Sequence, residues 1–264
     1  MKKTILINSA IAFSIAAITQ MTLHEVGHFL AALYFHATNL VLHHNYVSYD
    51  ENNLHLTQRI IIAAAGPIVS ILLGIMFHFL TIKYKKANVT RLVLLYMSIN
   101  GYIGFFGYLM IAPIFPYGDT GFICKALNLP MFIIISIAII GIIALVIVIR
   151  NIGKEFVAFI SKEAYEDDNL RKKFFNNLVH IPLYIGIAIT TLLNIPVPTV
   201  ASLTAPLCSP FSIMWCYGSL MRKRYSYPGN TIYTNALESI SKVWLVVFML
   251  VILLNRFLAI GALK

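Results

Sequence analysis

Long apolar runs alternate with short polar connections along most of this chain. Because a helix needs about 20 apolar residues to cross the hydrocarbon core of a bilayer, runs of this length predict membrane-spanning helices. The runs lie at about residues 5–34, 60–82, 91–115, 130–149, 178–195, 200–220 and 243–262. The pattern therefore predicts an all-α polytopic membrane protein.

The sixth run is the weakest of the seven. It contains Pro206, Pro210, Ser202 and Ser212, which disfavour an uninterrupted helix. A re-entrant or interfacial segment is nearly as compatible with this run as a span, so we expect about six transmembrane helices, with a seventh as the alternative. The first run continues well past the length of a signal peptide and contains no Ala-x-Ala cleavage site, which favours a retained helix.

Composition supports the membrane assignment. Hydrophobic residues make up 59% of the 264 residues, charged residues only 11%, and the mean hydropathy is +0.81, whereas soluble domains carry about 25% charged residues. The three cysteines form no paired motif, so neither a disulfide framework nor a Cys-based zinc finger is expected. The net charge of +10 lies largely at the ends of the apolar runs, as in membrane proteins, so no nucleic-acid partner is expected.

The connections between the runs are short, which predicts a single membrane domain over residues 1–264. The longest connection, residues 150–177, is charged and is predicted to be a solvated, partly helical surface loop.

The Lys and Arg residues predict the orientation of the chain. Alternate connections hold 16 of them against 3 in the other set, and the richer set includes the N-terminus. The positive-inside rule then places the N-terminus in the cytoplasm. If the sixth run does not cross, the split becomes 12 to 7.

Two carboxylates stand out among the 10 acidic residues. Most of the others lie in evident loops, but Glu25 lies within the first apolar run and Asp119 directly follows the third. An ionisable group at membrane depth is costly unless it is paired or bound to a metal, so both are functional candidates.

Residues 24–28 read His-Glu-Val-Gly-His, an HExxH motif. On a helix, His24 and His28 lie about 40° apart, so both imidazoles can face one metal ion. Glu25 lies about 100° from His24 and can act as a general base without being a ligand. The motif therefore predicts a zinc site with an open position for water.

Such a site needs a third protein ligand. Asp119 is the best candidate because it is the isolated carboxylate beside a span, in a segment broken by two prolines and two glycines. The rivals are Glu163, in an ExxxD spacing with Asp167, and the histidines of the first polar connection. Those histidines are His43, His44 and His55, and Cys124 is a further but weaker candidate.

Residues 40–57 are predicted to form a membrane-associated β-hairpin after the first helix. Residues 40–49 are rich in β-formers, residues 54–57 alternate, and residues 50–53 have the composition of a turn. An edge strand there could bind an extended peptide by β-augmentation, so this segment holds the candidate substrate-binding residues. An ordinary extramembrane hairpin is the alternative.

The order of these motifs resembles the site-2 protease family of intramembrane zinc metalloproteases. The resemblance rests on HEVGHF at 24–29, AAAGPIVSI at 63–71, and Asp119 in a Pro-containing segment, and it covers about residues 5–125. It implies three catalytic core helices within residues 1–125, with additional helices over 126–264. It also implies that His24, His28 and Asp119 bind zinc and that Glu25 is the base.

The same resemblance gives Gly66 and Pro67 a structural role near the site, as positions that permit close helix approach and free a backbone carbonyl. A kink without function is the alternative for this pair.

The chain departs from the family's pattern around Asp119. Ile111 stands where the family usually has Asn, Ile114 where it has Pro, and Thr120 where it has Gly; Ser70 stands where many members have Asn. Members also carry zinc nearer the cytoplasm, whereas the charge count here places residues 24–28 near the opposite face. Both orientations remain open at this point.

The sequence thus predicts a multi-pass zinc metalloprotease of the bacterial cytoplasmic membrane. Its partners are the lipid bilayer and a membrane-protein or peptide substrate. Two alternatives remain: an inactive relative that binds membrane segments, and a transporter whose metal site is its cargo site.

Overall fold

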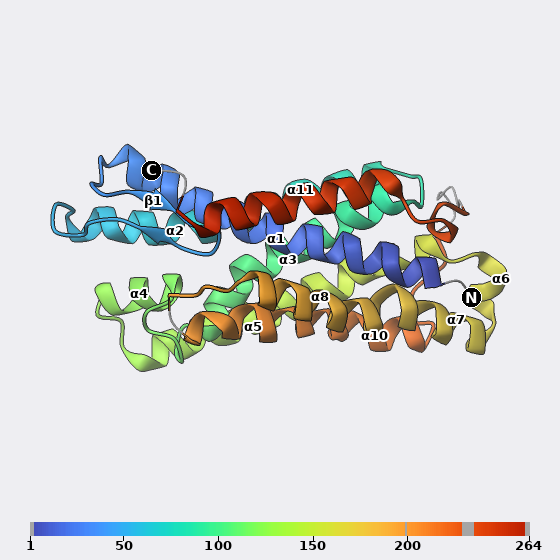
Figure 1. Ribbon diagram of the computed structural model, residues 1–264. Coiled ribbons are helices and arrows are strands. Elements are labelled where there is room, and N and C mark those ends of the chain that lie inside the picture. The colour runs from blue at the N-terminus through green and yellow to red at the C-terminus, as the bar shows by residue number, and fades with distance from the viewer. Residues whose placement is uncertain (1–2, 199, 229–234, 262–264) are drawn as a thin grey trace.

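The computed structural model describes residues 3–198, 200–228 and 235–261 and is a bundle of long helices (Figure 1). The long helices are α1 (Lys3–Tyr34), α2 (Leu56–Lys83), α3 (Val89–Ile111), α5 (Met131–Gly153), α8 (Ile181–Leu193) and α11 (Lys242–Ala259). The shorter α-helices are α4 (Asp119–Ala126), α6 (Lys162–Glu166), α7 (Asp168–Phe175), α9 (Thr204–Cys208) and α10 (Met214–Met221). Four 3₁₀ segments, η1 (Lys154–Phe159), η3 (Val200–Leu203), η4 (Ser209–Ile213) and η5 (Asn235–Glu238), and one π segment, η2 (Asn176–His180), complete the helical part.

Six helices in the described part of the chain are long and apolar enough to cross a membrane, which agrees with the expected number. Five are α1, α2, α3, α5 with its η1 extension, and α11; the sixth is the continuous stretch Asp168–Leu193, formed by α7, η2 and α8. These helices indicate a multi-pass membrane protein.

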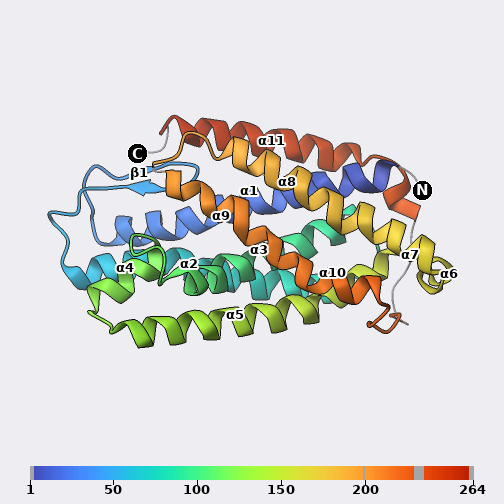
Figure 2. The same ribbon diagram turned by 90° about the horizontal axis from the view of Figure 1, so that it is seen from below.

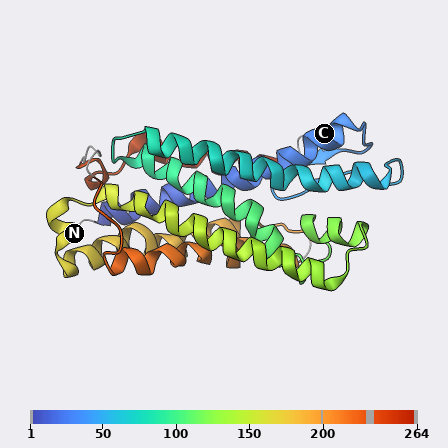
Figure 3. The ribbon, with the colours of Figure 1, turned by 180° about the vertical axis from the view of Figure 1, so that it is seen from behind.

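The helices run between two ends of the bundle. Figures 1 and 3 show the N-terminus, α6 and α7 at one end, called here the N-terminal end, and α4 with the β-strands at the other, called the hairpin end. The α2–α3 connection also lies at the N-terminal end, and α3 returns from there to the hairpin end.

The sixth apolar run of the sequence forms no single long helix. It is divided into η3, α9, η4 and α10, with Pro206 in α9 and Pro210 in η4. Figure 2 shows α9 and α10 following one another along the bundle from the hairpin end towards the N-terminal end. The prolines therefore break the helix, as expected, while the segment still runs along the bundle.

The centre of the bundle is formed by α1 and α3. Phe13 of α1 and Tyr96 of α3 are almost fully buried and meet edge to face, with ring centroids 5.4 Å apart. Helices α2, α5 and α11 instead expose large apolar side chains, such as Phe79, Ile140 and Leu253. A lipid environment would accept such faces, because it removes them from water.

The β-hairpin differs from the predicted one. Two-residue strands β1 (Val41–Leu42) and β2 (Val47–Ser48) pair antiparallel, so the reversal lies at residues 43–46 and not at 50–53. Residues 54–57 are not a strand, because α2 begins at Leu56. The His55 N–H donates to Oε1 of Gln58 at 2.8 Å, which satisfies one donor of the first turn. Four alternating residues were too few to distinguish a strand from a helix start.

The charged segment 150–177 is helical in part, as expected, but it is not simply solvated. Phe156, Phe159 and Phe175 are buried in the core, and the Arg91 guanidinium forms a 2.8 Å ion pair with Glu155. The segment thus closes the N-terminal end of the bundle.

Candidate metal centre

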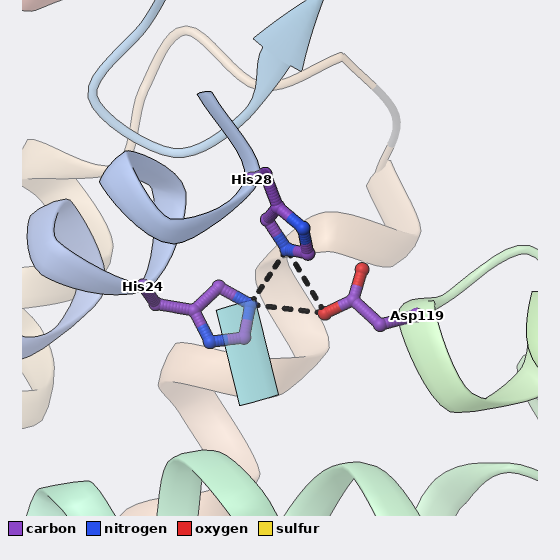
Figure 4. Close-up of side chains that lie close together, drawn as sticks. All are labelled: His24, His28 and Asp119. Atoms are coloured by element: carbon purple, nitrogen blue, oxygen red, sulfur yellow. Dashed lines mark hydrogen bonds and ion pairs between the residues drawn. The ribbon is translucent and has the colours of Figure 1, made fainter. Parts of the chain in front are cut away.

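Helix α1 places two imidazoles on one face. His24 and His28 are one turn apart, and both side chains are buried, with relative exposures of 4% and 7%. Figure 4 shows both rings projecting from the same helix towards Asp119, and their Nε2 atoms lie 3.1 Å apart.

Asp119 reaches the same point from a different part of the chain. Helix α3 ends at Ile111, residues 112–118 form an irregular connection containing Pro113 and Pro116, and α4 begins at Asp119. Its Oδ2 lies 2.9 Å from His24 Nε2 and 3.4 Å from His28 Nε2 (Figure 4). Burial opposes ionisation of this carboxyl, but when the imidazoles carry an added proton, attraction to His28 and hydrogen bonds from His24 and His28 outweigh it and hold the pKa of Asp119 below its usual range.

The other nitrogen of each imidazole is held by a hydrogen bond. His28 Nδ1 lies 2.7 Å from the carbonyl oxygen of Ile62, and His24 Nδ1 lies 2.9 Å from the hydroxyl of Ser70. The Ser70 hydroxyl in turn donates to the Gly66 carbonyl at 3.1 Å. Helix α2 therefore orients both rings through groups outside the cluster, the arrangement that metal-binding histidines usually have.

These partners assign the tautomers of the two rings. A carbonyl oxygen can only accept, so His28 Nδ1 carries a proton. The Ser70 proton is used on Gly66, so His24 Nδ1 also donates. In the neutral rings, both Nε2 atoms then present lone pairs towards each other and towards the Asp119 carboxylate. Three electron-pair donors converge, and a cation or an added proton among them is needed to offset their repulsion.

The spacing of the three atoms suits a metal ion. The ligand atoms of His24, His28 and Asp119 lie within 4.8 Å of one another, and this group is the one such cluster in the described part of the chain. Ligands about 2.0–2.2 Å from a tetrahedral ion lie about 3.3–3.6 Å from each other. Of the three separations, 3.4 Å falls in this range, whereas 3.1 and 2.9 Å are shorter, so the side chains would move apart slightly to take up an ion.

Gly66 keeps this space open. A Cβ at this position would lie 2.3 Å from His28 Nε2 and 2.7 Å from His24 Nε2, on the two atoms that face Asp119. On the side of α3, the ring of Tyr108 stacks on His24 with centroids 5.0 Å apart. Pro67 follows Gly66 inside α2 and lacks the N–H that would bond the carbonyl four residues earlier.

Glu25 is buried beside the cluster, with 7% exposure, and makes no hydrogen bond among the described residues. Glu25 and His24 line one cavity of about 800 Å³, together with residues of α3, the 114–118 connection, α8 and the 202–210 segment. A carboxylate with free acceptor capacity in a cavity beside three candidate ligands can exchange protons with a molecule bound there.

The structure does not bring the rival ligands to this cluster. Glu163 lies on α6 at the N-terminal end, far from α4 at the hairpin end (Figure 1). His43 stacks on Tyr46, the His44 Nε2 bonds the Asn194 carbonyl at 3.0 Å, and His55 caps α2. Cys124 is buried in α4 outside the group.

Three contributors to this region were not anticipated from the sequence. Ser70 was noted only as a departure from a family pattern, and Tyr108 and Gln20 were not singled out. Gln20 carries a usable signal, because it is a polar residue inside an apolar run and precedes His24 by one helical turn. Ser70 and Tyr108 both contact His24 from other helices, so neither contact follows from spacing within one helix.

Comparison of the chain with protein-family models, with curated proteins and with solved structures gives no match.

Proposed function

We propose that this protein is an intramembrane zinc metallopeptidase that hydrolyses peptide bonds of membrane-embedded or membrane-delivered peptides. The observation that carries the proposal is the convergence of His24, His28 and Asp119, with both Nδ1 atoms anchored, beside the buried carboxyl of Glu25, which lines one cavity with His24.

The donor set favours zinc. Two imidazoles and one carboxylate are a recurrent protein ligand set of catalytic zinc sites, which keep a fourth position open. His24 and His28 would bind through Nε2 and Asp119 through its carboxylate. When bound there, zinc would lower the pKa of a water molecule and polarise the scissile carbonyl.

Glu25 is the residue that moves protons in this proposal. Its carboxylate accepts a proton from the attacking water and delivers it to the nitrogen of the leaving amine, so that the carbonyl carbon gains an oxygen as the C–N bond breaks. The irregular connection before Asp119 and the broken segment 202–210 border the same cavity, where an unwound peptide could lie.

The resemblance to the site-2 protease family supports the same function. Its three motifs, which are distant in the sequence, meet at one place here: HEVGHF on α1, Gly66-Pro67 on α2, and Asp119 at the start of α4. The departure at position 70 preserves a hydrogen-bonding group, because the Ser70 hydroxyl contacts His24.

The test is the hydrolysis of synthetic transmembrane peptides by purified protein in phospholipid vesicles, read by mass spectrometry. We expect wild-type protein to cleave at least one peptide of a diverse pool. Glu25→Gln should retain zinc and lose activity by about 10²- to 10⁴-fold, since the amide cannot accept the proton.

Glu163→Gln is the matched control, because Glu163 is exposed at the other end of the bundle. This variant should cleave the peptides as wild-type protein does. Undiminished cleavage by Glu25→Gln would contradict the assigned role. Zinc binding without cleavage of any peptide would favour an inactive peptide-binding relative, and zinc transport into vesicles would favour a transporter.

A further inference from the structure

Gln20 is a buried amide without a hydrogen-bond partner. It is 5% exposed, and both its Nε2 and its Oε1 are buried with no partner among the described residues. Leaving such a group unpaired costs free energy, so a buried amide of this kind calls for a ligand or water. Because Gln20 also lines the cavity shared by Glu25 and His24, a molecule in that cavity can supply the missing partners.

Gln20 lies close to the candidate metal centre. It precedes His24 by one turn of α1, so the two side chains share a face of the helix. Gly104 of α3 faces both Gln20 and Ser70: a Cβ there would lie 3.0 Å from Gln20 Nε2 and 2.9 Å from Ser70 Oγ, the hydroxyl that contacts His24. The amide is therefore within reach of a substrate held at the cluster.

The other amides of the cavity differ in their pairing. Asn100 uses its donor within α3, since its Nδ2 donates to the Tyr96 carbonyl at 2.9 Å. Asn45 uses its Nδ2 on the carbonyls of Asn194 and Pro196, which fixes the orientation of its amide and leaves Oδ1 without a partner. Among the described residues, the cavity thus offers an unused donor and acceptor at Gln20, and further unused acceptors at Asn45 Oδ1 and Asn194 Oδ1.

We propose that Gln20 is a substrate-positioning residue that binds the backbone of one extended substrate residue, through Nε2 to the carbonyl of that residue and through Oε1 to its N–H. A primary amide is complementary to these two groups, because the N–H and C=O of an extended residue point to the same side of the chain and the amide carries one carbonyl acceptor and N–H donors. Recognition of backbone and not of a side chain holds an extended segment in place without restricting its sequence. This inference rests on the proposed peptidase function.

The experiment uses a peptide that wild-type protein cleaves in a Glu25-dependent manner. A series of its analogues replaces one backbone amide at a time by an ester, outside the scissile bond, which removes the N–H and weakens the carbonyl as an acceptor. For wild-type protein, one position in the series should lower kcat/KM by about tenfold. Gln20→Met keeps the length of the side chain but removes the amide, so it should lower kcat/KM for the parent peptide by about the same factor. For this variant, kcat/KM should be equal for the parent peptide and for the ester analogue at that position.

Asn100→Leu is the matched control, because it removes an amide of the same cavity whose Nδ2 is already paired. It should keep the wild-type ratio between amide and ester at every position. Gln20→Leu serves the same purpose as Gln20→Met if the methionine variant does not fold.

The outcomes separate this proposal from the one on which it rests. A Gln20→Met protein that cleaves with full kcat/KM, or that retains the response to every ester, overturns the role of Gln20 while the peptidase function stands. Loss of zinc from Gln20→Met also overturns it, because the amide would then act through Ser70 and His24. Absence of Glu25-dependent cleavage by wild-type protein overturns the peptidase function itself, and the role of Gln20 with it.

Discussion

At the scale of single residues, the candidate metal centre requires a glycine beside the ligands as well as the ligands themselves. This glycine is Gly66, because its missing Cβ leaves room for the two Nε2 atoms. Replacing it by alanine would favour the helical conformation of α2 by about 1 kcal/mol. Any loss of metal binding in that variant would therefore come from obstruction of the site.

We expect Gly66→Ala to weaken zinc binding by at least about 10- to 100-fold, the range found when the surroundings of a metal ligand are disturbed. Zinc affinity can be measured by competition with a chelator of known affinity. Gly218→Ala in α10 is the control, since a Cβ there has nothing within 4 Å, and it should bind zinc as wild type does. Equal affinities for the two variants would show that the metal does not lie between the imidazoles.

The sequence predicted part of this centre for identifiable reasons. The turn periodicity of a helix brings His24 and His28 to one face, and the isolation of Asp119 among apolar residues marks it as a candidate. The anchoring of His24 by Ser70 depends on how α1 and α2 pack, and a serine inside an apolar helix has too many other uses to be singled out.

At the scale of elements, the short helix α4 delivers Asp119. The connection before it packs tightly on the first turn of α4: a Cβ on Gly121 would lie 2.0 Å from the Phe115 carbonyl oxygen. A backbone atom cannot rotate away as a flexible side chain can, so a side chain at this position has to displace α4 or the connection.

Gly121→Ala is therefore expected to destabilise the protein by about 1–3 kcal/mol, as overpacking does, and to lower zinc content by moving Asp119. Gly118→Ala is the control in the same segment, because its Cβ would meet its nearest neighbour, the Phe115 carbonyl oxygen, at an ordinary 3.5 Å. Chemical unfolding in detergent and zinc analysis of both variants check this. If the two behave alike, the position of α4 does not control the site.

Elements were predictable where the pattern was long and unpredictable where it was short. Runs of about 20 apolar residues gave the six long helical stretches, and the prolines correctly indicated a break in the 200–220 run. The hairpin lies in the predicted segment, but its reversal does not lie at residues 50–53 as predicted. A cluster of polar residues is typical both of a turn and of the segment before a helix, and here it precedes the start of α2 at Leu56.

At the scale of the whole molecule, the distribution of charge bears on the orientation of the site. The N-terminus, the α2–α3 connection and α6–α7 lie together at the N-terminal end (Figures 1 and 3), and these connections belong to the set that holds 16 of the Lys and Arg residues. The candidate metal centre lies towards the hairpin end. The positive-inside rule then predicts that the centre lies nearer the non-cytoplasmic face.

Labelling of introduced cysteines in intact cells tests this orientation, since the native Cys124 and Cys216 are buried. The background protein has Cys208, which is exposed, replaced by serine. A cysteine at Lys85, between α2 and α3, should react with a membrane-impermeant reagent only after the membrane is opened, whereas one at Asn52, between β2 and α2, should react from outside. The reverse pattern would place the centre near the cytoplasm, as in the family that the motifs resemble.

The central claim is that His24, His28 and Asp119 bind one metal ion together, and zinc content per purified chain measures it most directly. Asp119 is the decisive position, because two imidazoles without a third ligand make a poor site. Asp50→Ala is the matched control, since this aspartate also lies near the hairpin end but outside the cluster. We predict about one zinc per chain for wild type and for Asp50→Ala, and a much lower content for Asp119→Ala after dialysis against the same free zinc concentration. A wild-type chain that takes up no zinc, or an Asp119→Ala chain that takes up as much as wild type, would contradict the account.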